Sequence, residues 1–102
     1  MYEVVYLPTA RQQLMDAALY IAAELSAPDA AENLLDAVDE QVGKLSDHPY
    51  RHPVYPTSYA MKHEIRFFPV KHYLVFYVIR EEKKTVEIWR FLHQRQNISK
   101  HL

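Results

Sequence analysis

Five basic side chains stand beside apolar, strand-like segments in the second half of this sequence. They are Arg66, Lys71, His72, His93 and Arg95. Arginine grips a phosphate group through two parallel N–H donors, and histidine exchanges protons near neutral pH because its ordinary pKa is about 6.5. These residue types supply what RNA cleavage without a metal requires: removal of the 2′-hydroxyl proton, stabilisation of charge at phosphorus and protonation of the 5′-oxygen.

Each of these residues also has a structural explanation. Arg66 could pair with Glu64, Glu87 or a helix carboxylate, and His72 could be an ordinary residue at the entry to a strand. His93 and Arg95 are harder to explain in this way, because they follow an apolar strand near the end of the sequence.

Charge is divided unevenly along the chain. Residues 1–50 carry two basic and nine acidic side chains, a net charge of −7, whereas residues 51–102 carry ten basic and four acidic ones, a net charge of +6. A cationic half favours a local site for an anionic ligand. The overall charge of −1 argues against indiscriminate binding of nucleic acid.

Composition excludes several classes of protein. The 102 residues contain no cysteine, so disulfides, thiolate metal sites and cysteine nucleophiles are excluded. Gly43 is the only glycine, which rules out a glycine-rich phosphate loop. No acidic cluster accompanies the histidines, so we expect no metal and no other cofactor. No segment approaches the roughly 20 apolar residues of a membrane span, and the start lacks an export pattern, so we expect a cytoplasmic protein without membrane contact.

Apolar spacing predicts a strand and two helices in the first half. Residues 2–6 are rich in β-branched and aromatic side chains and predict a short strand. Helical spacing of apolar residues then predicts a helix over 10–25, and Pro28 starts a second helix that continues to Leu45. The short turn between the helices favours an antiparallel hairpin.

Three further strands are expected in the second half. Residues 46–59 hold three of the six prolines and predict a loop. Strand patterns follow at 63–68, 73–79 and 85–92. Residues 73–79 are apolar on both faces, which indicates a central strand covered on both sides.

Successive side chains of a strand point to opposite faces of a sheet, and this rule predicts which residues of the last strand share a face. Ile88 and Leu92 are expected on one face together with Arg90, and Trp89 and Phe91 on the other.

The element order β-α-α-β-β-β predicts a single α+β domain over residues 1–102. The helical hairpin is expected to cover one face of a mainly antiparallel sheet. The opposite face would then be free to carry a site.

Residues 64–97, EIRFFPVKHYLVFYVIREEKKTVEIWRFLHQRQN, resemble the C-terminal half of the RelE/ParE toxin superfamily. In that superfamily an arginine-bearing strand leads to an apolar central strand, a charged turn and a last strand ending in His or Tyr and one or two Arg. The first half matches as well, through the pair Tyr20-Ile21 and the motifs at 28–31 and 45–49. One departure is Gln96-Asn97, where many relatives have a second Arg followed by Asp.

The resemblance implies a RelE/ParE-like fold and the toxin role in a bacterial type II toxin–antitoxin system, with a cognate antitoxin as partner. Members similar to RelE cut mRNA in the ribosomal A site without a metal, and members similar to ParE inhibit DNA gyrase. By position, Arg66 corresponds to the arginine that contacts the scissile phosphate. His93 corresponds to the acid–base residue, and Arg95 corresponds to the C-terminal arginine.

Three functional hypotheses follow. The leading one is a ribosome-dependent mRNA endonuclease with Arg66, His93 and Arg95 as catalytic residues. Its candidate RNA- or phosphate-binding residues are Lys71, His72 and Arg90. The alternatives are a non-enzymatic inhibitor that binds DNA gyrase through the helical hairpin and the C-terminal tail, and a decayed toxin that binds only its antitoxin.

Overall fold

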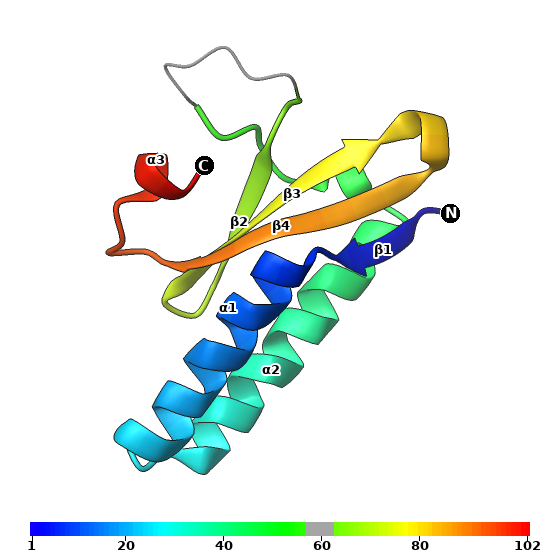
Figure 1. The fold of residues 1–102 in the computed structure, drawn as a ribbon. Coiled ribbons are helices and arrows are strands. Elements are labelled where there is room, and N and C mark those ends of the chain that lie inside the picture. The colour runs from blue at the N-terminus through cyan, green and yellow to red at the C-terminus, as the bar shows by residue number, and fades with distance from the viewer. Residues whose placement is uncertain (57–62) are drawn as a thin grey trace.

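The computed structural model describes residues 1–56 and 63–102. Its main elements are β1 (Glu3–Tyr6), α1 (Pro8–Leu19), α2 (Pro28–Gly43), β2 (Arg66–Val70), β3 (Tyr73–Arg80), β4 (Thr85–His93) and α3 (Ile98–His101). The two long helices form a hairpin on one side of the sheet, and α3 lies on the other side (Figure 1). The expected α+β class and element order are confirmed, with α3 as an addition. Residues 57–59 of the predicted loop lie outside the described residues.

Helix α2 begins at Pro28 as predicted, and α1 begins at Pro8, two residues before the expected start. Pro8 and Pro28 open α1 and α2, because proline has no N–H to leave unpaired and its fixed φ suits a first helical turn. The first helix continues past Leu19 as a π-helical turn over Tyr20–Glu24. Within the described residues, no helix is long and apolar enough to cross a membrane.

The sheet has the strand order β1-β4-β3-β2. Strand β1 runs parallel to β4, and the other two pairs are antiparallel. Strand β3 is therefore central, as predicted. Its Val75 and Tyr77 join the main core beneath the helices, while Phe76 and Val78 join a second cluster on the other face. All four side chains are at most 1% exposed.

The sheet face opposite the helices is not free, which corrects the sequence-based expectation. Ile98 and Leu102 from the C-terminal segment pack against its apolar cluster, together with Tyr55 from the loop before β2. Phe76 and Leu92 belong to this cluster, and both are buried. Exposure of such large apolar side chains to water would be unfavourable. This face is therefore a second, smaller core.

Strand β4 contains a bulge that simple alternation does not predict. Phe76 lies opposite Arg90 but Tyr77 lies opposite Ile88, so Trp89 is an extra residue on β4. Beyond the bulge the faces are exchanged: Phe91 joins Ile88 in the main core, and Leu92 joins the second cluster. The expectation that Ile88 and Leu92 share a face is therefore wrong.

His52 packs the loop before β2 against the main core. Its ring stacks on Phe68 with 4.4 Å between centroids and meets the edge of Tyr77. The His52 Nε2 atom is buried and has no hydrogen-bond partner among the described residues. Burial lowers the pKa of His52, and the nearby Arg51 charge lowers it further.

We expect His52 to make the protein less stable in mild acid. Because its pKa is lower in the folded protein, the unfolded chain takes up the proton first as the pH falls below the ordinary value of about 6.5. The free energy of unfolding should therefore fall between pH 7.5 and pH 5.5, as measured by urea denaturation. His52→Phe keeps an aromatic ring against Phe68 and should show a shallower fall. An equally steep fall in the variant would contradict this role, because other histidines would then account for it.

Candidate functional site

Four of the predicted site residues gather at the end of β4. His93 lies opposite Tyr73 in the sheet register, and the two rings meet edge to face at 5.1 Å between centroids. The His72 ring lies 6.4 Å from that of His93. Lys71, in the turn before His72, has a left-handed φ of 56°, and Arg95 is exposed in the turn that follows β4. This sheet end is therefore cationic and carries two imidazoles.

A hydrogen bond to the His93 ring decides which ring nitrogen carries the proton in the neutral form. The backbone N–H of Arg95 donates to Nδ1 of His93 over 3.1 Å. The neutral ring therefore carries its proton on Nε2. In this tautomer Nε2–H can donate a hydrogen bond, for example to a phosphate oxygen, and His93 can take up a proton only at Nδ1, after that atom releases the Arg95 N–H.

Arg66 is held at a different place, on the first residue of β2. Its Nη1 donates to the His52 carbonyl oxygen over 2.7 Å, and its guanidinium lies 5.0 Å from the centre of the Tyr50 ring. Its Nη2 is 3.7 Å from a carboxylate oxygen of Glu64. The side chain is only 18% exposed. Arg66 therefore anchors the loop before β2 to the sheet.

The structure does not bring Arg66 and His93 together. Arg66 lies opposite Tyr77 and His93 lies opposite Tyr73, so the two are four residues apart along β3, about 13 Å. They also belong to the two strands on either side of β3. Convergence of all the basic residues on one surface, as expected from the sequence, is not observed.

Arg90 also makes structural contacts. Its Nε donates to the His101 carbonyl oxygen over 3.1 Å, and its Nη1 donates to the Trp89 carbonyl oxygen over 2.7 Å. Arg90 thus fastens α3 to the second cluster, beyond the bulge. Among residues 1–56 and 63–102, no three His, Cys, Asp or Glu side chains are placed to hold a metal ion.

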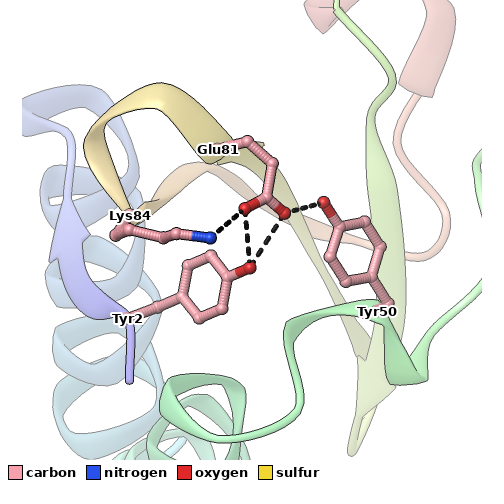
Figure 2. Close-up of polar contacts among 4 residues, drawn as sticks. All are labelled: Tyr2, Tyr50, Glu81 and Lys84. Atoms are coloured by element: carbon pink, nitrogen blue, oxygen red, sulfur yellow. Dashed lines mark hydrogen bonds and ion pairs between the residues drawn. The ribbon is translucent and has the colours of Figure 1, made fainter.

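An exposed polar cluster near the turn between β3 and β4 was not evident from the sequence. Glu81 accepts hydrogen bonds from the hydroxyls of Tyr2 and Tyr50, and Lys84 donates to it over 2.7 Å (Figure 2). Hydrogen bonds from Lys84, Tyr50 and Tyr2 lower the pKa of Glu81 to about 2. The cluster joins the start of the chain, the loop before β2 and the β3–β4 turn, and it holds Tyr50 against Arg66. No spacing in the sequence links Tyr2 and Tyr50 to Glu81, because both tyrosines are distant from it along the chain.

A family model and two solved structures are similar to this chain. A sequence model of the ParE toxin of the type II toxin–antitoxin system parDE matches residues 4–98. Among solved structures, a chain of the chromosomal ParDE system from P. aeruginosa aligns with a TM-score of 0.70 and 18% identity, over 91% of this chain and 96% of that chain. A chain of the RelBE2 toxin–antitoxin complex from Mycobacterium tuberculosis aligns with a TM-score of 0.58 and 25% identity, over 90% and 96%. No curated protein sequence gives a significant match.

We expect Arg66→Ala to destabilise the fold. The change removes the hydrogen bond to His52 and the contact with Tyr50, and the loss should be about 1–3 kcal/mol in the free energy of unfolding. Arg95→Ala is the matched control, because Arg95 is exposed and its loss should stay within about 0.5 kcal/mol. Equal effects of the two changes in urea denaturation would show that Arg66 is not an anchor.

Proposed function

The chain belongs to the family of ParE toxins of type II toxin–antitoxin systems, and on this premise we propose that it acts by binding DNA gyrase rather than by cutting RNA. The resemblance of the sequence to the RelE/ParE superfamily leaves both activities open. The two similar solved structures come from toxin–antitoxin systems, which supports a cognate antitoxin as the second partner.

The observation that carries the proposal is the separation of Arg66 from His93. Metal-free cleavage of RNA requires a charge-stabilising group about 3 Å from the oxygens on which charge develops, and a proton-transfer group at the same phosphate. The two residues are offset by about 13 Å along β3. Arg66 would also have to leave the His52 carbonyl and the Tyr50 ring before it could reach a phosphate. Inhibition by binding requires no such rearrangement.

The helical hairpin is the surface that we assign to gyrase. Asp36 and Asp39 are exposed on the acidic side of α2, directed away from the main core. A rigid helix with a defined charge pattern can bind a protein target in a single orientation.

A second candidate function is ribosome-dependent mRNA cleavage centred on His93 and Arg95. The pairing of the His72 and His93 rings favours it, because two imidazoles can share the acid and base steps. Lys71 adds positive charge for phosphate binding at the same sheet end. In this candidate function Arg66 would contribute only after release from its present contacts.

A gyrase supercoiling assay with purified variants separates the two functions. We expect the wild-type protein to inhibit supercoiling and His93→Ala to inhibit equally, because no proton transfer is involved. A variant in which both Asp36 and Asp39 are replaced by Arg reverses the charge of this side of α2, and it should inhibit at least tenfold more weakly. Glu82→Arg makes the same kind of charge change at an exposed residue of the β3–β4 turn and should have no effect.

Primer extension on a defined mRNA, with and without programmed ribosomes, tests the second candidate. Under the gyrase proposal the message stays uncut in both reactions. Cuts that appear only with ribosomes, and disappear in His93→Ala, would overturn the gyrase proposal in favour of the nuclease.

A further inference from the structure

A groove of about 590 Å³ lies beside the start of the chain, and two tyrosines, Tyr2 and Tyr50, line it. Tyr2 precedes Glu3, which pairs with Thr85 at the start of β4. His93 ends the same strand, so the groove and His93 lie at opposite ends of the sheet. The volume is within the range of about 300–1,000 Å³ that is typical of sites for small molecules. The candidate residues predicted from the sequence do not line this groove.

Glu81 holds the two tyrosine rings in place. Its carboxylate accepts hydrogen bonds from the hydroxyls of Tyr2 and Tyr50, and Figure 2 shows the two rings directed toward it from different segments of the chain. Lys84 donates to the same carboxylate, and its amine lies 5.2 Å from the centre of the Tyr2 ring. Tyr50 is 51% exposed, and an exposed side chain ordinarily loses rotamer freedom when a ligand binds. Because these rings are already held, a ligand that stacks on them loses less affinity to their ordering.

The groove also carries positive charge. His48 and Arg51 line it, and both are exposed. No described carboxylate lies within ion-pair distance of either side chain. A guanidinium binds phosphate through paired N–H donors, and an aromatic ring stacks on a flat base. This lining therefore suits a phosphate group that is attached to a flat, aromatic ring system.

Asp47 is the acidic residue of the lining. A carboxylate accepts hydrogen bonds, so Asp47 would repel a phosphate but can accept from the amino group of a base or from a sugar hydroxyl. A simple aromatic phosphate leaves this acceptor unused. A nucleotide carries all three of the groups that the lining matches, namely a base, a phosphate and hydrogen-bond donors.

We propose that this groove binds a nucleotide. The base stacks on Tyr2 and Tyr50, the phosphate lies at Arg51 and His48, and Asp47 accepts a hydrogen bond from the base or the sugar. The site is an addition to the proposed activity and does not depend on whether gyrase or the ribosome is the target. A free nucleotide and one nucleotide of a single strand offer the same base and phosphate, and titrations with each separate these two sources.

Isothermal titration calorimetry of the purified full chain measures the binding. The ligands are AMP, adenosine and an adenylate RNA hexamer, because adenine offers a large face for stacking. We expect AMP to bind at least tenfold more tightly than adenosine, which lacks the phosphate. A Kd per nucleotide at least threefold lower for the hexamer than for AMP would identify a strand as the ligand, and any smaller difference would identify a free nucleotide. Absence of binding by both AMP and the hexamer at millimolar concentration would overturn the proposal, as would equal affinities for AMP and adenosine.

Replacement of Tyr50 tests the stacking half of the site. Tyr50→Ala removes one ring and should raise the Kd of the tighter ligand at least fivefold. Tyr20→Ala is the matched control, because Tyr20 is 55% exposed but does not line the groove. Its Kd should stay within twofold of the wild-type value. An equal loss of affinity in the two variants would contradict the assignment of the groove.

Replacement of Arg51 tests the phosphate half without disturbing the tyrosines. Arg51→Gln leaves the hydrogen bonds of Tyr2 and Tyr50 to Glu81 in place, so it keeps the rings held. It should raise Kd at least fivefold for AMP or the hexamer. Arg95→Gln removes the same charge from an exposed residue outside the groove and should leave Kd within twofold. Unchanged affinity in Arg51→Gln would overturn the proposal.

Discussion

The burial of β3 on both faces is the constraint on which the rest of the structure depends. Val75 and Tyr77 require cover on one side of the sheet, and Phe76 and Val78 require cover on the other. The helical hairpin meets the first requirement. The second is met by short segments, α3 and the loop before β2. A strand that is apolar on both faces thus fixes a three-layer arrangement in a chain of only 102 residues.

The shortness of β1 shapes the surface near the end of β4. Four residues of β1 pair with the first half of β4, and the chain then turns into α1. The second half of β4 is left without a strand on that side, and exposed backbone N–H groups at a sheet edge invite pairing with another chain. Gln13 and Gln96 satisfy two of these groups, the N–H of Phe91 and the N–H of His93, without adding a strand to the edge.

Arg66, the first residue of β2, shows that an arginine can serve either function or folding. Arg66 has the charge and the strand position of a phosphate-binding residue. Its contacts with the His52 carbonyl and the Tyr50 ring also make it an anchor of the loop, and Tyr77 adds a buried hydrogen bond to the Pro49 carbonyl oxygen. An arginine in a partly buried position satisfies its donors wherever acceptors are near, and in this fold the nearest acceptor is the loop.

The amino-acid sequence alone determined the order of the helical hairpin and the four strands, and the central strand, because apolar periodicity and turn residues act over short stretches of chain. The resemblance of its motifs also indicated the family. The sequence also placed Lys71, His72, His93 and Arg95 at or next to strand ends. Only the tertiary structure decided that Trp89 forms a bulge and that Arg66 lies apart from His93. Strand register and bulges depend on packing between segments that are distant along the chain. The pattern of apolar residues within one segment does not reveal that packing.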